Sequence, residues 1–280
     1  MAADSATIDR YGVMGHPVSH SRSPIIHRLF ATQTAQVLQY ELLQVSPDKL
    51  EQAIRQFQRT GGRGLNITVP HKREVCRFVD QMSARARAAG AANTLTFQDG
   101  EIAGDNTDGI GLLRDLVVNL GVNLEGADVL ILGAGGATRG IVSPLLEMQL
   151  KSLLIANRTL DKAQALAEHF EDLGPVAACR FNAVPVTEPF NLIINATSAG
   201  FRGETPPYPK AAVSKKTFCY DLSYGFKPTP FSVWARENGA ARSVMGWGML
   251  VEQAAESFHI WRGVRPDTAP VLKQISITAY

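Results

Sequence analysis

The chain has 280 residues, of which 45% are hydrophobic and 19% charged, so one large or two ordinary globular domains with sizeable cores are expected. The net charge of +2 and the scattered Lys and Arg residues argue against nucleic acid or an anionic membrane as a partner. The widely spaced Cys76, Cys179 and Cys219 indicate neither a disulfide framework nor a zinc site, and no metal is expected. A polar N-terminus and the lack of a long apolar segment predict a soluble, cytoplasmic chain.

The first hundred residues alternate between strand and helix patterns. Short apolar or alternating runs predict strands at 11–15, 39–45 and 64–69, and helical periodicity predicts helices at 24–35 and 47–59. A shorter helix is expected at 72–79. Alternating runs at 92–98 and 101–105 flank Asp99-Gly100 and predict a β-hairpin. A helix at 109–120 is expected to lead into a second domain.

The chain changes character from Asp128 onward. VLILG, LLIAN, LIINA and FCYDL are short, nearly all-apolar strands separated by helical stretches, which is typical of a parallel sheet covered on both faces. A helix at 248–262 comes after this sheet is complete. We therefore predict one α/β domain at 1–108, a second α/β domain at 109–244, and a C-terminal helical segment at 245–280 that packs back on the first domain.

The segment ADVLILGAGGATRGIVSPLLEM has the order strand, glycine turn, helix that is typical of a Rossmann-type dinucleotide-binding domain. Gly133 permits the tight turn, and Gly135 lets the backbone approach a pyrophosphate. The helix that opens at Ala137 offers its free N–H groups to the same anion. The third glycine of the usual pattern is replaced by Thr138, which is expected to loosen the packing of helix on strand slightly.

The second strand of this domain, SLLIAN, distinguishes between the two nicotinamide cofactors. NAD-binding domains usually end this strand with an acidic residue that holds the ribose 2′-hydroxyl. Here the strand is followed by Arg158 and Thr159, with Lys162 one turn later. A guanidinium in place of an acid suits a 2′-phosphate, so the sequence predicts NADP as the cofactor.

Three polar clusters lie in the first domain: SHSRSP, NITVPHK, and AANT together with GDNTDG. Ser23 before Pro24 is expected to cap a helix, but capping leaves Ser21 unexplained. Hydroxyl and amide groups in such number suit a polyhydroxylated substrate. Lys72 and Asp108 offer a proton donor and a partner to orient it, as an alcohol–ketone interconversion requires.

The motifs SHSRSP, NITVPHK, GAANT, GDNTDG, GAGGATRG, NRT, NATSAG, YDLSYGFKPTPF and GMLVEQAAESF, in this order, resemble the shikimate dehydrogenase family over essentially the whole chain. The resemblance implies an N-terminal α/β substrate domain, a Rossmann-type NADP-binding domain and a C-terminal helix that returns to the first domain. It also implies the reversible NADP-dependent reduction of 3-dehydroshikimate to shikimate in aromatic amino-acid biosynthesis.

The resemblance carries roles to particular residues. It implies Lys72 and Asp108 as the catalytic pair, which also contacts the substrate. The other substrate-binding residues that it implies are Ser21, Ser23, Thr68, Asn93, Tyr224 and Gln253. The cofactor-binding residues are Gly133, Ala134, Gly135, Gly136, Ala137, Asn157, Arg158, Thr159, Lys162, Asn195, Ala196, Thr197, Ser198, Leu222, Gly246 and Met249. The sequence departs from the family where Met245-Gly246-Trp247 replaces the common Asp-Gly, which affects the loop near the nicotinamide.

Two alternatives remain open. A quinate or dual quinate/shikimate dehydrogenase shares the fold and mechanism, and substrate choice depends on a few side chains. A non-catalytic NADP-binding regulator is disfavoured because both Lys72 and Asp108 are present. His71 is expected to be a neighbour of the site and not a catalyst. The expected partners are small molecules only, with the chain acting as a monomer or a homodimer.

Overall fold

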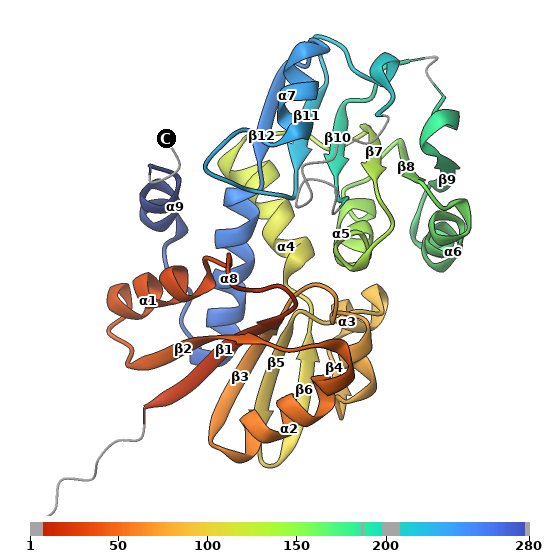
Figure 1. The fold of residues 1–280 in the computed structure, drawn as a ribbon. Coiled ribbons are helices and arrows are strands. Elements are labelled where there is room, and N and C mark those ends of the chain that lie inside the picture. Colours follow the sequence, from red (N-terminus) through yellow and green to blue (C-terminus); the bar gives the residue numbers. More distant parts are fainter. Residues whose placement is uncertain (1–7, 186–187, 198–207, 278–280) are drawn as a thin grey trace, which may run out of the picture. The chain divides into compact units, whose positions relative to one another are not determined.

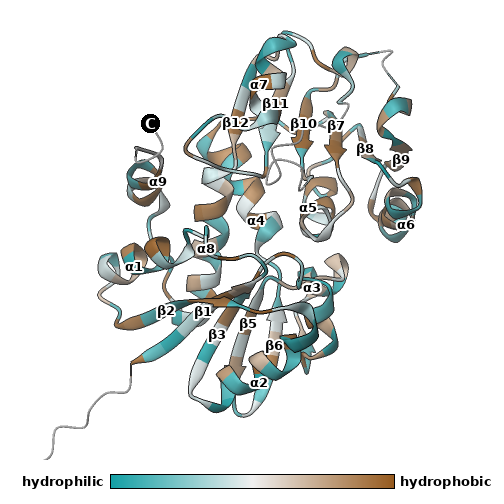
Figure 2. Cartoon of the chain, viewed as in Figure 1, coloured by the Kyte–Doolittle hydropathy of each residue, from teal (hydrophilic) through white to brown (hydrophobic). Residues whose placement is uncertain are grey.

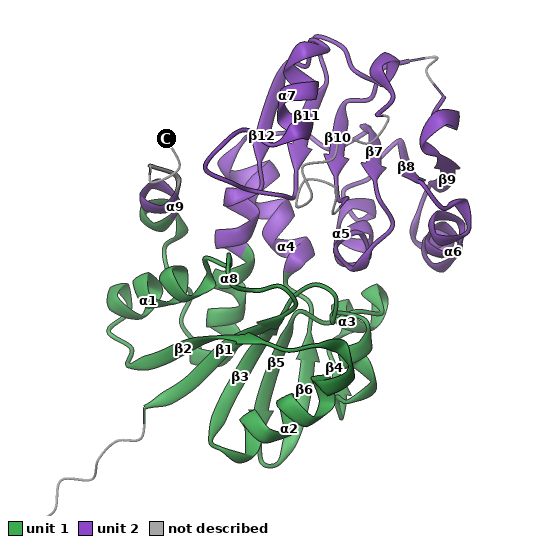
Figure 3. Ribbon diagram, in the orientation of Figure 1, with its two compact units in different colours: residues 1–107, 253–271 green, residues 108–252, 272–280 purple. Residues whose placement is uncertain are grey.

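The computed structural model describes residues 8–185, 188–197 and 208–277. The chain divides into two compact units, each built around a β-sheet (Figures 1 and 3). Unit 1 comprises residues 1–107 and 253–271, and unit 2 comprises residues 108–252 and 272–280. The predicted α/β class, with a Rossmann-type domain, is confirmed.

The described part of unit 1 contains a mixed sheet with the strand order β2-β1-β3-β5-β6-β4. In this sheet β1 is parallel to β2 and β3, whereas β5 is antiparallel to β3 and β6. The strands are β1 (Asp9–Gly15), β2 (Leu38–Gln44), β3 (Gly62–Ile67), β4 (Gln81–Met82), β5 (Thr94–Gln98) and β6 (Glu101–Asp105). The helical segments are α1 (Ser23–Gln33), η1 (Pro47–Lys49), α2 (Leu50–Arg59), η2 (Glu74–Arg77) and α3 (Ala84–Ala89).

Most elements predicted for unit 1 are present, and the exceptions are short. Asp99 and Gly100 have φ angles of 51° and 84°, as expected for the tight turn of the predicted hairpin. The helix expected at 72–79 is wrong, because only the 3₁₀ turn η2 forms there. Strand β4 and helix α3 were not predicted, since two and six residues are too few for a periodic pattern.

Unit 2 contains a parallel sheet with the strand order β12-β11-β10-β7-β8-β9. Its strands are β7 (Asp128–Leu132), β8 (Ser152–Asn157), β9 (Val176–Arg180), β10 (Leu192–Asn195), β11 (Phe218–Asp221) and β12 (Arg242–Met245). The helical segments are α4 (Asp108–Leu113), η3 (Arg114–Asn119), α5 (Gly136–Leu146), α6 (Leu160–Phe170), η4 (Glu171–Leu173), η5 (Phe181–Ala183), η7 (Lys210–Ala212) and α7 (Pro230–Glu237).

The central strands β7 and β10 of unit 2 have hydrophobic colours in Figure 2, and their residues are buried on both faces, as their composition predicts. Val129 and Ile131 of β7 belong to one hydrophobic cluster, whereas Leu130 and Leu132 belong to another. Successive side chains of a strand point to opposite faces, so helices must cover both sides of the sheet. The first cluster includes residues of α4, α5 and α6, and the second includes residues of α7.

The helix predicted at 109–120 is present, but its second half has a different geometry. Helix α4 continues into the π-helix η3, in which the amide of Leu120 donates to the carbonyl of Asp115 at 2.9 Å. A π-helical turn widens the backbone and is frequently found at functional sites. Asp115, 3% exposed, lies in this widened stretch.

Helix α8 (Trp247–Arg262) contributes residues to both units, and α9 (Thr268–Ile277) follows it. Its first turns contact unit 2, where Glu252 pairs with Arg114 at 2.9 Å. Its later turns contact unit 1, where Trp261 Nε1 donates to the carbonyl of Leu95 at 3.0 Å. The division between the units therefore lies inside α8, after Glu252, and not at the predicted 244/245 boundary. Among the described residues, no helix is both long and apolar enough to cross a membrane.

Candidate active site

The strands of unit 2 end together, and this alignment gathers most of the predicted cofactor-binding residues. Leu132 pairs with Ala156 and Asn195, and Asp221 pairs with Asn195 and Met245. The residues that follow at this carboxyl edge are Gly133, Asn157, Ala196, Leu222 and Gly246. The order of strands reverses between β7 and β10, which is the position where parallel α/β sheets bind dinucleotides.

The glycine turn after β7 has the geometry that its sequence predicts. Gly133 has a φ of 107°, and a Cβ there would lie 3.0 Å from the backbone of Ala196. Gly135 is the N-cap of α5 without a side-chain cap, and a Cβ there would meet open space. The first amides of α5, together with this open space, suit a pyrophosphate.

Thr138 replaces the third glycine of the pattern and is fully buried. Its hydroxyl donates to the carbonyl of Gly133 at 2.9 Å. The predicted loosening is thus offset by a hydrogen bond from the helix to the preceding turn.

The residues after β8 present positive charge to solvent. Asn157 Nδ2 donates to the carbonyl of Thr159 at 2.8 Å, which fixes the turn. Arg158, Thr159 and Lys162 are exposed. Within the described ranges, neither cation has an ion-pair partner, so both are available to an anion.

The ends of β10 and β11 are joined by a buried carboxylate. Asp221 accepts hydrogen bonds from Asn195 Nδ2 at 2.9 Å and Thr229 Oγ1 at 2.5 Å. Burial raises the pKa of Asp221 although these donors oppose the shift. Asn195 Oδ1 in turn accepts from the Thr197 hydroxyl at 2.8 Å. This network shapes the start of the NATSAG loop, in which Ser198 lies outside the described residues.

In unit 1, Ser21 and Ser23 begin a hydrogen-bond chain. Ser21 Oγ donates to Ser23 Oγ at 3.2 Å, and the Ser23 side chain faces the Tyr40 hydroxyl, where it partly offsets the rise in the pKa of Tyr40 that burial causes. The predicted capping by Ser23 is wrong: the N-cap of α1 is Arg22, and Ser23 is the first helical residue. The hydroxyl of Ser23 accepts from Ser21 and makes no capping hydrogen bond to α1. Tyr40 continues the chain by donating to Asn66 Oδ1 at 2.7 Å.

Asn93 and Gln253, which come from distant parts of the sequence, meet in a buried cluster of amides and hydroxyls. Asn93 Nδ2 lies 3.3 Å from Gln253 Oε1 and 2.9 Å from Thr107 Oγ1. Asn66 Nδ2 donates to the carbonyl of Asn93 at 3.2 Å and to Ser257 Oγ at 3.0 Å. The cluster therefore extends the chain from the serines to the residue that precedes Asp108.

Asn66, Thr107, Ser257, Thr94 and Tyr40 were not among the predicted site residues. Asn66 and Thr107 lie in motifs that the sequence analysis singled out, so their membership of NITVPHK and GDNTDG was an available signal. Ser257 lies in GMLVEQAAESF, one helical turn after Gln253, and Thr94 lies in GAANT, so the same signal was available for both, whereas no quoted motif includes Tyr40.

The predicted catalytic residues flank this cluster along the chain. Lys72 is half-buried in a turn after β3, and its carbonyl accepts the Ala92 amide at 2.8 Å, directly before Asn93. Asp108 is 3% exposed and begins α4 immediately after Thr107. Thr68 is half-buried at the end of β3, where its amide donates to the carbonyl of Met14 at 2.9 Å.

His71 has a structural environment, as predicted. Its Nε2 lies 2.7 Å from the carbonyl of Val45, so this nitrogen donates. Burial lowers the pKa of His71, which keeps the ring neutral near pH 7. The ring thus ties the turn that carries Lys72 to the end of β2.

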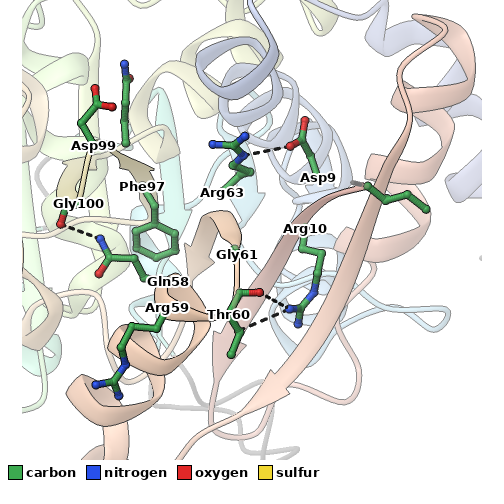
Figure 4. A pocket seen from close by; sticks show the side chains of 13 residues that line it. Asp9, Arg10, Gln58, Arg59, Thr60, Gly61, Arg63, Phe97, Asp99 and Gly100 are labelled. Atoms are coloured by element: carbon green, nitrogen blue, oxygen red, sulfur yellow. Dashed lines mark hydrogen bonds and ion pairs between the residues drawn. The ribbon is translucent and has the colours of Figure 1, made fainter. Parts of the chain in front are cut away.

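A cavity of about 890 Å³ lies at the end of the unit 1 sheet where β1 and β3 begin, opposite to the end that leads to Ser21 and Lys72 (Figure 4). It is lined by the beginnings of β1 and β3 and by the hairpin turn at Gly100. Arg63 Nε donates to Asp9 at 3.0 Å, and Arg10 donates to the carbonyl of Thr60 at 3.1 Å. None of the predicted site residues lines this cavity, so we do not assign the active site there.

Known proteins match the chain along most of its length. The shikimate dehydrogenase substrate binding domain matches residues 13–95, shikimate / quinate 5-dehydrogenase matches 115–206, and the shikimate 5'-dehydrogenase C-terminal domain matches 246–275. The shikimate dehydrogenase (NADP(+)) of Alkalilimnicola ehrlichii is 53% identical, over 94% of this chain and 97% of its own length. The chain belongs to the shikimate dehydrogenase family. The predicted resemblance is thereby confirmed.

Two further relatives extend the match within the family. The shikimate dehydrogenase (NADP(+)) of Methylococcus capsulatus is 54% identical, over 95% of this chain and 96% of its own length. The crystal structure of shikimate 5-dehydrogenase from Thermus thermophilus in complex with NADP(H) and shikimate has a TM-score of 0.85 and is 30% identical. That alignment covers 97% of this chain and all of the other.

The departure from the shikimate dehydrogenase pattern at Met245-Gly246-Trp247 has a clear structural result. Trp247 is 7% exposed, and its ring lies 4.8 Å from that of Tyr224 and 6.1 Å from that of Phe226. Among the described residues, its indole N–H has no hydrogen-bond partner. The indole therefore holds the Tyr224 loop by packing, and Tyr224 is a predicted substrate contact.

Proposed function

We propose that this chain catalyses the reversible NADP-linked reduction of 3-dehydroshikimate to shikimate. The observation that carries the proposal is the network of hydroxyl and amide groups in unit 1, which connects Tyr40, Asn66, Asn93 and Thr107, the residue before Asp108. Such a network provides hydroxyl and amide groups for a polyhydroxylated acid. The carboxyl edge of unit 2 supplies the glycine turn and the exposed cations that suit NADP.

We assign the proton transfer to Lys72, with Asp108 orienting it. NADPH, when bound, supplies a hydride to the C3 carbonyl carbon of the substrate. Lys72 donates a proton to the carbonyl oxygen, directly or through a water, so that the ketone becomes an alcohol. The Asp108 carboxylate holds the ammonium in place for this transfer.

Ser21 and Ser23 are assigned to the substrate carboxylate, because they lie at the start of α1, where amides and hydroxyls converge on an anion. Thr68, Asn93 and Gln253 are assigned to its hydroxyl groups. Quinate carries an additional hydroxyl beside the carboxylate, so we expect shikimate to be the better substrate.

The setting proposed for this reaction is the cytoplasm, as a monomer or homodimer. The free thiols of Cys76, Cys179 and Cys219 fit a reducing compartment. Light scattering on a size-exclusion column tests the assembly, and a higher oligomer would contradict it.

A steady-state assay at the absorbance band of reduced nicotinamide tests the function. Shikimate and quinate are each tried as the substrate with NADP and with NAD. We expect the highest kcat/KM for shikimate with NADP. A kcat/KM for quinate equal to or above that for shikimate would favour the quinate dehydrogenase. Cofactor binding without turnover of either acid would identify a regulator instead.

A further inference from the structure

The first turn of α8 is anchored by a buried tyrosine that belongs to the sheet. The Tyr220 hydroxyl donates to Asp115 Oδ2 at 2.6 Å and accepts from the amide of Met249 at 3.2 Å. The first amides of a helix have no partner within the helix. Here a hydroxyl from β11 supplies one, and Tyr220 is fully buried. The anchor therefore connects the π-helix η3, the central sheet and the start of α8.

Two glycines allow the helix to come close to this anchor. A Cβ at Gly248 would lie 1.9 Å from Asp115 Oδ1, so no other residue fits without displacing the carboxylate. A Cβ at Gly246 would lie 2.7 Å from the carbonyl of Leu222. The Gly246 amide also donates to the carbonyl of Ser223 at 3.1 Å. The turn 246–249 is thus held against the carboxyl end of β11 at two points.

The carboxylate of the anchor belongs to a polar cluster inside an apolar core. Asn119 Nδ2 donates to Asp115 Oδ1 at 3.0 Å and to Glu252 Oε1 at 3.3 Å. Burial raises the pKa of Asp115, and the nearby Glu252 adds to this shift. Tyr220 and Met249 meanwhile belong to the hydrophobic cluster of unit 2. Buried carboxylates are costly unless they are hydrogen-bonded, and apolar side chains would fill the same space without that cost.

The position of the 246–249 turn matters because two residues assigned to the cofactor lie in it. Gly246 and Met249 are the residues assigned to the nicotinamide end of the cofactor. The other assigned cofactor residues lie after β7, β8, β10 and β11, so most of the binding energy arises elsewhere. Hydride transfer is sensitive to displacements of about 1 Å, whereas affinity for the rest of the cofactor is not.

We propose that Asp115 and Tyr220 are positioning residues, which set the depth of the 246–249 turn and thereby align the nicotinamide for hydride transfer. This inference rests on the proposed function, because it needs Gly246 and Met249 to contact that ring. If the proposal holds, the Tyr220 hydroxyl affects the rate of turnover and not the affinity for the cofactor.

Tyr220→Phe tests the proposal, since it removes one oxygen and keeps the packed ring. We expect kcat to fall by about tenfold or more, the effect of a small misplacement of reacting groups. KM for NADPH should stay within about threefold of wild type, because the phosphate and adenosine contacts are intact. The primary isotope effect with NADPH deuterated at the transferred position should rise as hydride transfer becomes more rate-limiting. Tyr11→Phe is the matched control, because it also removes a buried hydroxyl, 3.4 Å from Arg262 in unit 1.

A lower melting temperature with unchanged kcat and isotope effect would show that the hydroxyl is merely structural and would overturn the proposal. If Tyr220→Phe does not fold, a comparison of Asp115→Asn with Asp115→Ala tests the anchor, because the amide oxygen can still accept from Tyr220 and a methyl group cannot. We expect Asp115→Asn to keep more turnover than Asp115→Ala, and equal losses would refute the anchor. Inactivity of the wild-type enzyme toward shikimate would instead refute the proposed function, so the two failures are distinguishable.

Discussion

Replacing Arg158 with alanine tests how the chain distinguishes NADP from NAD. The two cofactors differ only in the 2′ substituent of the adenosine ribose. Arg158 follows β8 and is exposed, and no carboxylate among the described residues pairs with it. Its guanidinium is therefore free to form bidentate hydrogen bonds with a phosphate. Hydrogen bonds to charged groups contribute about 1.5–3 kcal/mol each, and exposure to water favours the lower value.

A loss of about 1.5 kcal/mol weakens binding by roughly tenfold. We therefore expect Arg158→Ala to raise KM for NADP at least about tenfold, whereas KM for NAD barely changes. Exposed charges are screened by salt, so the difference between variant and wild type should narrow as KCl rises from about 0.05 to about 0.5 M. The measurement is the initial rate of nicotinamide absorbance at saturating shikimate, with each cofactor titrated in turn.

Lys216→Ala is the matched control, because it removes an exposed cation from the turn before β11, at the opposite edge of the same sheet. This variant should keep the wild-type KM for both cofactors. Parallel increases of KM for NADP and NAD in Arg158→Ala would refute the reasoning. Such a result would mean that Arg158 supports the fold or stacks on the adenine instead of binding the phosphate.

Three further predictions concern unit 1. Lys72→Ala should lower kcat by about two to four decades with a smaller effect on substrate binding, and wild-type kcat in the folded variant would remove Lys72 from the mechanism. Asn66→Ala breaks a buried cluster and should lower the free energy of unfolding in urea by about 2–4 kcal/mol, whereas a loss below about 0.5 kcal/mol would contradict its place in the network. Burial raises the pKa of Asp105, but Arg85 outweighs this and holds the pKa below the ordinary value of 3.8. The ion pair of Asp105 with Arg85 therefore stabilises the fold above about pH 4, and this contribution is lost as the pH falls further. Asp105→Asn should accordingly lose less stability than wild type between about pH 5 and about pH 3.

The family resemblance was readable from the sequence because its motifs are local. Several of the predicted features depend on only a few consecutive residues: the positive φ of Gly133, the arginine after β8 and the Asp99-Gly100 turn. Near-continuous apolar strands likewise predicted a sheet buried on both faces, because alternate residues point to opposite faces and both faces are then apolar. These features were confirmed, whereas the roles assigned to individual site residues stay predictions.

Other features depended on contacts between distant segments. Ser23 was expected to cap α1, but its hydroxyl accepts from Ser21 and faces Tyr40, which no local pattern connects to it. Short elements such as β4 and α3 lacked the length for a periodic signal.

By itself, the sequence determined the α/β class, the glycine turn and the positive charge after β8, since backbone conformation and strand burial follow from neighbouring residues. The tertiary structure alone decided which residues support the site. Ser257 reaches Asn66 across 191 positions of the chain, and Tyr220 reaches Asp115 across 105. A hydrogen bond between such residues depends on how sheets and helices pack, and side-chain periodicity records only which face a residue occupies. That is why the predicted catalytic pair was visible in the sequence, while the network that positions its neighbours was not.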